Sequence, residues 1–246
     1  PDDVDAYFQH AAARWGRVSL RSAAFALRTW FRHCEAKTWT RPGLAAAILV
    51  PRVYRDEGLP LGPTWGQVAR LLAEVSGDTP QHLRNTAMLR LLAIYGLRSG
   101  EVRRLAVHDV DWQHQRLRIT RSKSGRHETY PLETSVACAV ERYLREARPP
   151  TSLPTLFLTL RAPFRPLSAG ALYYLVQRGL LPDQPRKSRG PHGLRHACAR
   201  HLIDAGLSFK EVGDHLGHQS PDSTRVYAKV DVAALRLVAM EDLAPL

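Results

Sequence analysis

A histidine and an arginine suited to binding an anion follow Pro191 at the start of an expected helix, residues 192–205. His192 and Arg195 are three residues apart, so on a helix they share a face. The N-terminal end of a helix also favours negative charge. An imidazole beside a guanidinium at this place suits a phosphate group. The alternative is purely structural: Arg195 forms an ion pair and His192 caps the helix.

Three further residues could take part in phosphoryl transfer. Tyr227 follows a polar turn, and because a phenol has a pKa of about 10, it needs nearby cations and a proton acceptor to act as a nucleophile. Arg98 lies in a loop between two helices, where its planar fork matches two phosphate oxygens. Lys123 is at the tip of an expected hairpin, from which an ammonium could deliver a proton. Taken singly, a packed aromatic, a surface arginine and an ordinary turn lysine also explain these residues.

Together the segments around these residues resemble one family, the tyrosine recombinases or phage-type integrases. That family carries an Arg in a GLRxxE segment, a Lys on a β-hairpin, an HxLRH helix and an LGH segment, and its nucleophilic Tyr follows the last His by nine residues. The resemblance covers residues 64–246, whereas residues 1–60 are similar to the family's helical core-binding domain only in pattern. The matches, in the family's order, are Arg98, Lys123, His192 with Arg195, His218 and Tyr227.

The resemblance implies how the phosphate is attacked and held. Tyr227 attacks the scissile DNA phosphate and forms a 3′-phosphotyrosine link. Arg98 and Arg195 hold the non-bridging oxygens and offset charge in the transition state. Two guanidiniums supply the charge that a metal ion would, so neither a metal nor another cofactor is expected. The phosphotyrosine conserves the bond energy, so rejoining needs no ATP.

The resemblance also assigns the proton transfers. Lys123 acts as the general acid for the departing 5′-hydroxyl, with Lys187, in a basic loop, as the weaker candidate. His192 assists the proton of Tyr227, and His218 donates a hydrogen bond to the phosphate. We expect Glu101 to form a structural ion pair or to cap its helix.

The net charge agrees with a nucleic-acid partner. The chain has 35 Lys and Arg against 23 Asp and Glu, a net charge of +12, which favours a polyanion. The resemblance implies that this partner is double-stranded DNA with a specific recombination site, bound by a homotetramer on two DNA sites. An accessory DNA-bending protein or a second recombinase is a further candidate partner. The residues expected to contact DNA are Arg121, Arg126, Lys187 and Arg189.

The elements that must position these residues are mainly helical, with a small antiparallel β-sheet. A Pro- and Gly-rich stretch over residues 51–63 predicts a linker. We therefore expect a helical core-binding domain over residues 1–58, truncated at its N-terminus, and a catalytic domain over residues 59–246. A C-terminal helix over residues 232–240 packs on its own domain or on a neighbouring subunit. The other expected helices cover residues 2–13, 18–34, 44–49, 81–95, 133–148, 168–180, 192–205 and 208–216, with a further helix opening at Thr64, and the expected hairpin strands lie at 117–120 and 127–132.

Composition excludes several other classes of protein. The sequence contains no run of about 18 apolar residues, so it predicts no transmembrane helix, and the N-terminus lacks a signal-peptide pattern. The three cysteines, Cys34, Cys138 and Cys198, form no CxxC pair, which argues against a disulfide framework and a zinc ribbon. A reducing setting fits best, and we expect a bacterial cytoplasmic protein associated with the nucleoid.

Three rival functions account for part of the pattern. Residues 206–227 read like a helix-turn-helix, as in a non-catalytic DNA-binding regulator. A zinc protein could use His192, His196, Cys198 and His201, but these residues cannot all share one helical face. A type IB topoisomerase uses similar residues to relax DNA. The regulator does not explain Arg98 and Lys123, and the HxLRH and LGH segments favour a recombinase over a topoisomerase.

Overall fold

The structure is a computed structural model that describes residues 2–51, 62–121, 125–179 and 190–217. The chain divides into two compact units, residues 1–58 and 59–246, at the place where the sequence predicts a domain boundary. The expected helix at 232–240 and the residues Lys123, Lys187, Arg189, His218 and Tyr227 lie outside the described residues.

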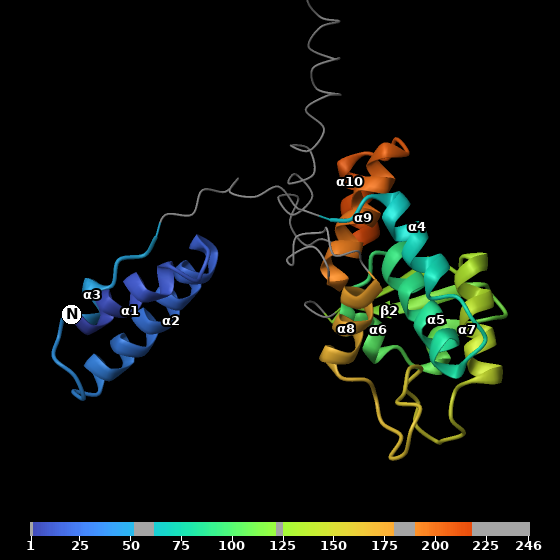
Figure 1. The fold of residues 1–246 in the computed structure, drawn as a ribbon, viewed down its shortest axis with the longest axis horizontal. Coiled ribbons are helices and arrows are strands. Elements are labelled where there is room, and N and C mark those ends of the chain that lie inside the picture. The colour runs from blue at the N-terminus through green and yellow to red at the C-terminus, as the bar shows by residue number, and fades with distance from the viewer. Residues whose placement is uncertain (1, 52–61, 122–124, 180–189, 218–246) are drawn as a thin grey trace, which may run out of the picture. The chain divides into compact units, whose positions relative to one another are not determined.

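The first unit is helical, as expected. It contains α1 (Asp2–Ala12), α2 (Arg17–Ala36) and the short α3 (Leu44–Ala47) (Figure 1). The helix predicted over residues 18–34 is confirmed as α2, which buries Leu20, Ala24 and Cys34. Glu35 on α2 accepts a hydrogen bond from the backbone N–H of Ala45 at 2.9 Å, which ties α3 to α2.

The second unit is built around α5 (Pro80–Ile94), which packs against α4 (Trp65–Glu74), α7 (Thr134–Glu146) and α9 (Pro191–Asp204) (Figure 1). The expected capping box opens α4: the Thr64 N–H donates to Gln67 Oε1 at 2.8 Å and the Gln67 N–H donates to Thr64 Oγ1 at 3.3 Å. The remaining helices are α6 (Ser99–Arg104), the 3-10 turn η1 (Val107–Asp109), α8 (Ala169–Gly179) and α10 (Phe209–Leu216).

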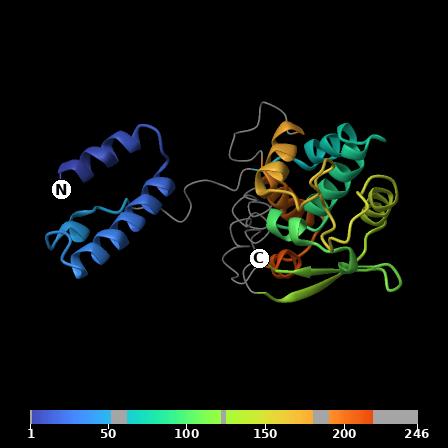
Figure 2. The same ribbon diagram turned by 90° about the horizontal axis from the view of Figure 1, so that it is seen from below.

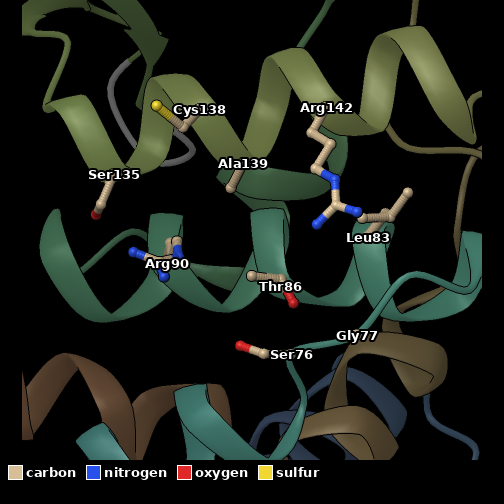
Figure 3. A pocket seen from close by; sticks show the side chains of 9 residues that line it. All are labelled: Ser76, Gly77, Leu83, Thr86, Arg90, Ser135, Cys138, Ala139 and Arg142. Carbon is tan, nitrogen blue, oxygen red and sulfur yellow. The ribbon is translucent and has the colours of Figure 1, made fainter.

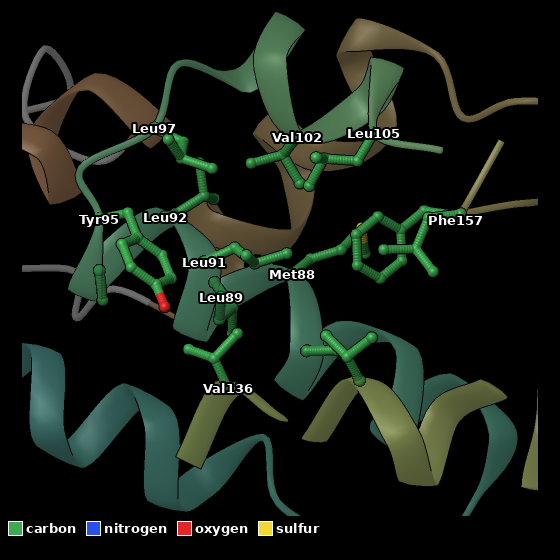
Figure 4. Close-up of a cluster of buried hydrophobic side chains, with 14 of the residues drawn as sticks. Met88, Leu89, Leu91, Leu92, Tyr95, Leu97, Val102, Leu105, Val136 and Phe157 are labelled. Carbon is green, nitrogen blue, oxygen red and sulfur yellow. The ribbon is translucent and has the colours of Figure 1, made fainter. Parts of the chain in front are cut away.

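The core of this unit is formed largely around the buried side chains of α5. Met88, Leu89, Leu91 and Leu92 are at most 2% exposed, and they contact apolar residues of α6, α7 and the segment around Phe157 (Figure 4). The apolar residues of 87–93, interrupted only by Arg90, place this part of α5 in the core. Gly96, just after the C-terminal end of α5, lies next to α9 and α10.

A three-stranded antiparallel sheet lies beside the helices, with β1 (Val110–Asp111), β2 (Arg116–Thr120) and β3 (His127–Pro131) in that order. Leu117 pairs with Tyr130 and Ile119 pairs with Glu128, so these four residues share the inner face. The predicted hairpin is confirmed. Figure 2 shows the hairpin beside α10. The Tyr130 hydroxyl donates to the His215 carbonyl at this place.

Within the described residues, no helix is both long enough and apolar enough to cross a membrane.

Candidate active site

Arg98 is positioned by a carboxylate one helical turn further along the chain. Arg98 caps the N-terminus of α6, and its backbone N–H donates to Glu101 Oε2 at 2.8 Å. Its guanidinium forms an ion pair with Glu101 Oε1 at 2.9 Å, with the Arg98 side chain 27% exposed and that of Glu101 fully buried. Glu101 both forms the ion pair and caps the helix, as the sequence predicts. Arg98 is thereby held with part of its guanidinium accessible to solvent.

Burial and hydrogen bonding act on Glu101 in opposite directions. Removal from water is the largest single effect and by itself raises the pKa of the carboxyl group. The two hydrogen bonds from Arg98 and the charges of Arg121 and Arg98 outweigh it, so the pKa of Glu101 lies below its usual value. The carboxylate is therefore ionised at neutral pH and binds both guanidiniums.

Arg195, on α9, joins two segments that are distant in the sequence. Its Nη1 donates to the Gly96 carbonyl at 2.6 Å and its Nη2 donates to the Leu216 carbonyl at 2.7 Å. Gly96 immediately precedes the segment that carries Arg98, and Leu216 ends α10. Gly96 has a φ of +57°, and a Cβ there would lie 2.4 Å from Leu216, so both the backbone conformation and the close packing require glycine.

His192 lies near both arginines. Burial lowers the pKa of its imidazole, and the positive charges of Arg195 and Arg98 lower it further. The cap of α9 is Gly190, so the interpretation of His192 as a helix cap is wrong. Its ring also meets that of His196, with centroids 4.4 Å apart at 74°. His192 is consequently neutral at pH 7 and can accept a proton.

The described part of the site combines two guanidiniums with a neutral imidazole. Arg195 donates to the Gly96 carbonyl at 2.6 Å, which holds the first turns of α9 next to the segment that leads to Arg98 and α6. The charges of both arginines lower the pKa of His192. Guanidiniums match the oxygens of a phosphate group, and a neutral imidazole can take a proton from a nucleophile beside it. The arrangement can therefore bind a phosphate and assist proton transfer.

The predicted contact of Arg121 with DNA is wrong for this structure. Arg121 is 3% exposed and points into the domain, where it forms ion pairs with Glu101 and Glu128. Strand alternation is the signal that could have placed it correctly, because Arg121 follows the buried Leu117 and Ile119 at the same period of two. Arg126, on the far side of the hairpin tip, is exposed.

The inner face of the hairpin contributes polar residues that no sequence motif singled out. Tyr130 and Glu128 face the same side as Leu117 and Ile119. The Tyr130 hydroxyl lies 2.7 Å from the His215 carbonyl oxygen and 2.8 Å from Glu128 Oε2. These residues tie the sheet to the end of α10.

The four residues of the zinc alternative have other contacts. His201 stacks on Trp65 with ring centroids 3.9 Å apart, and the Cys198 thiol donates to the Ile94 carbonyl at 3.4 Å. In the described ranges, no three His, Cys, Asp or Glu residues lie close enough together to hold a metal ion.

A cavity of about 310 Å³ lies between α5 and α7, away from these residues (Figure 3). Arg90 and Arg142 line it together with Ser76 and Cys138, whereas Arg98, His192 and Arg195 are not among its described lining residues. One of its two arginines, Arg142, is already paired with Asp78 at 2.6 Å and Glu146 at 3.1 Å. The candidate site is therefore the Arg98–Arg195–His192 group and not this cavity.

Comparison with known proteins shows the family. The model of the phage integrase family matches residues 64–233. A Sinorhizobium fredii protein named as an integrase/recombinase, y4gC, is 42% identical over 178 residues, which cover 71% of this chain and 92% of that protein. The tyrosine recombinase XerD of Mycobacterium tuberculosis is 32% identical over 228 residues, covering 90% of this chain and 72% of XerD.

Other relatives are longer than this chain. Two further Sinorhizobium fredii proteins are 35% and 33% identical, and the chain spans 58% and 57% of their lengths. Among solved structures, a lambda integrase dimer bound to a COC′ core site is similar with a TM-score of 0.69 at 19% identity, over 92% of this chain and 63% of that chain. At this identity the likeness concerns the fold.

The fold, the grouping of Arg98, His192 and Arg195, and relatives 32–42% identical all lead to the same assignment. The chain belongs to the phage integrase family of tyrosine recombinases.

Proposed function

We propose that this protein cleaves and rejoins DNA strands at specific sites through a 3′-phosphotyrosine intermediate. The observation that carries the proposal is the contact between the Arg98 segment and α9: Arg195 Nη1 donates to the carbonyl of Gly96, two residues before Arg98, at 2.6 Å. His192 lies three residues before Arg195 on the same helix, and burial and both arginines lower its pKa. Two fixed guanidiniums stabilise the charge that develops on the phosphate oxygens in the transition state. A neutral imidazole beside them can accept the proton of an attacking hydroxyl.

In the proposed reaction, the phenolic oxygen of Tyr227 forms a bond to the scissile phosphorus and the bond to the 5′-oxygen breaks. His192 accepts the phenolic proton, and Lys123 donates a proton to the departing 5′-oxygen. His218 donates a hydrogen bond to the phosphate. Rejoining reverses these steps: the 5′-hydroxyl attacks the phosphotyrosine and the phenol leaves.

The proposed substrate is double-stranded DNA, held in part by Arg126, Lys187 and Arg189. We further propose a homotetramer on two DNA sites, with accessory proteins as candidate partners. Two similar structures support this, a lambda integrase tetramer bound to a Holliday junction and the XerH recombinase bound to its palindromic difH substrate. Because we propose a DNA substrate, we also propose that the protein acts at the nucleoid, in the bacterial cytoplasm.

Covalent capture tests the proposal with no target sequence chosen in advance. The protein is incubated with a library of nicked synthetic duplexes of random sequence, denatured with detergent, and the DNA that remains attached is sequenced. We expect the wild type to capture a subset of sequences at the 3′ side of the cleavage site. Tyr227→Phe should bind the same duplexes and capture none. Absence of adducts with the wild type, or their persistence with Tyr227→Phe, refutes the catalytic proposal.

The same experiment separates the two rival functions. A regulator would bind without capture, and the exposed residues Glu211 and Asp214 already make α10 a poor recognition helix for a polyanion. A topoisomerase would capture DNA with little sequence preference and relax a supercoiled plasmid. A recombinase joins the captured strand to a second duplex.

A further inference from the structure

Arg121 is a buried arginine that follows β2 and connects it to three other elements of the catalytic domain. Its side chain is 2% exposed. Its Nε donates to Glu128 Oε2 at 2.6 Å, its Nη1 to Glu101 Oε2 at 3.3 Å, and its Nη2 to the His215 carbonyl at 3.1 Å. Nη2 also contacts the Tyr130 hydroxyl. Its partners therefore belong to α6, β3 and the end of α10.

The charge and shape of a guanidinium are both needed for these contacts. Burial opposes the positive charge and is the largest single effect on the pKa of Arg121, but Glu128, Tyr130 and Glu101 more than compensate, and the pKa is raised. Arg121 reaches its partners through three different nitrogens, which a planar fork allows and a single ammonium does not. Replacement by lysine would keep the charge but lose most of the contacts.

A glycine and a tyrosine complete the connection to α10. Burial raises the pKa of the Tyr130 hydroxyl, so it keeps its proton and can donate to the His215 carbonyl or to Glu128. Gly217 has a φ of +64°, and a Cβ there would lie 2.3 Å from the Nε of Arg121. The chain after α10 thus passes directly against the guanidinium.

The contacts of Arg121 occur where the chain leads to two residues of the proposed mechanism. Arg121 precedes Lys123 by two residues, and His215 precedes His218 by three. Arg121 holds the His215 carbonyl and Arg195 holds the next one, that of Leu216. Glu101 is shared between Arg121 and Arg98.

We propose that Arg121 is a positioning residue for strand cleavage: its buried guanidinium fixes the end of β2 against α6 and α10, and so sets where Lys123 can reach. The inference rests on the proposed function, and it replaces the contact between Arg121 and DNA expected from the sequence. Arg121 acts through Lys123, and its partners in the described residues are Glu101, Glu128, Tyr130 and the His215 carbonyl.

The test compares two leaving groups on a duplex sequence recovered by covalent capture. The normal substrate loses a 5′-oxygen, which must gain a proton. A 5′-bridging phosphorothiolate loses a sulfur, which leaves as a thiolate and needs no acid. A defect in placing the acid is therefore relieved by sulfur, whereas a defect in holding the phosphate or in folding is not.

We expect Arg121→Lys to slow adduct formation about 100-fold on the normal substrate, the scale of a misplaced general acid. On the phosphorothiolate the loss should be less than about fivefold. DNA affinity should stay within about twofold of the wild type, because Arg121 is buried. The matched control is Arg145→Lys on α7, an exposed arginine paired with Glu146 at 2.7 Å, which should leave both rates unchanged.

A second variant, Tyr130→Phe, removes one contact of Arg121 and keeps the charge, and it should show the same relief by sulfur with a smaller loss. It decides the question if Arg121→Lys does not fold. Full activity of both variants, or an equal loss on the two substrates, overturns the inference while leaving the proposed function standing. Absence of adducts with the wild type on both substrates overturns the proposed function and the inference together.

Discussion

At the scale of single residues, the site contains buried charges that are stable only because neighbouring groups of opposite charge pair with them. Glu101 is fully buried and ionised because Arg98 and Arg121 donate to it. A buried carboxylate stabilises the fold only while those donors remain. Its lowered pKa means that its contribution is complete above about 4.5, the ordinary value for Glu, and is lost as the pH falls through the folded-state pKa.

Glu101→Gln should lower the free energy of unfolding by about 2 kcal/mol at pH 7, since two guanidiniums lose their shared charge partner. Urea denaturation measures the loss. The matched control is Glu141→Gln, whose side chain is 61% exposed and pairs with Arg145 at 3.7 Å. That change should stay within about 0.5 kcal/mol. Equal losses for the two variants would contradict the role of Glu101.

His196 makes stability depend on pH in the range where histidines titrate. Burial, and then the charges of His192 and Arg195, lower the pKa of His196 from 6.5 to about 4. Between these values the unfolded chain binds a proton that the folded protein does not, so stability rises with pH across this window. On acidification from 6.5 to 4 the wild type should lose roughly 2–3 kcal/mol more than His196→Gln. Urea denaturation at several pH values measures the loss. An equal loss of unfolding free energy in the wild type and in His196→Gln would refute this prediction.

At the scale of elements, the end of α10 is held more tightly than its length suggests. The helix runs only from Phe209 to Leu216, yet Arg195 and Arg121 bind its last carbonyls. Carbonyl groups at a helix C-terminus have no partner within the helix, and cationic side chains satisfy them well. The two arginines thereby fix the point from which the chain continues to His218.

Gly217→Ala should be clearly more destabilising than an equivalent change elsewhere. Gly217 and Gly125 have φ values of +64° and +67°, so alanine costs about 1–2 kcal/mol of backbone strain at either position. At Gly125 a Cβ meets nothing within 4 Å, whereas at Gly217 it meets Arg121. We expect an additional loss of about 1–3 kcal/mol for Gly217→Ala in thermal or urea unfolding. Similar losses of stability at both glycines would show that the Arg121 side chain moves away from the added methyl group at little energetic cost.

At the scale of the whole molecule, each of the two units has its own buried residues. The main apolar cluster consists only of residues from the second unit, while Leu20, Ala24 and Ile48 are buried within the first. Most of the excess positive charge lies in the second unit, because residues 1–58 hold only nine of the 35 basic residues and six of the 23 acidic ones. Stability and DNA affinity should therefore respond differently to loss of the first unit.

A variant lacking residues 1–58 should still unfold in one cooperative transition, because its core is intact. Its affinity for DNA should fall, and the dependence of log K on log salt should become shallower by about 2, since each lost phosphate contact removes about 0.9 from the slope. Binding to the random duplex library at several salt concentrations measures both effects. An unchanged slope would mean that the first unit makes no contact with the DNA backbone.

Local sequence signals were sufficient for most elements of the fold. The helix that opens at Thr64, the helix expected at 81–95 and the hairpin strands at 117–120 and 127–132 each depend on neighbours a few residues away. Hydrophobic period and caps act over one or two turns, so they can be identified without the tertiary structure. Residue types and their order likewise indicated Arg98, His192 and Arg195 together with the family.

Only the tertiary structure decided what these residues contact. Arg195 binds the carbonyl of Gly96, 99 residues away, and Arg121 binds that of His215, 94 residues away. No local pattern specifies such a partner, because the contact exists only after α5, α9, α10 and the sheet have packed together. For this reason the sequence predicted Arg121 as a surface residue that binds DNA. Packing instead buries it between two carboxylates, where it holds the hairpin against the end of α10.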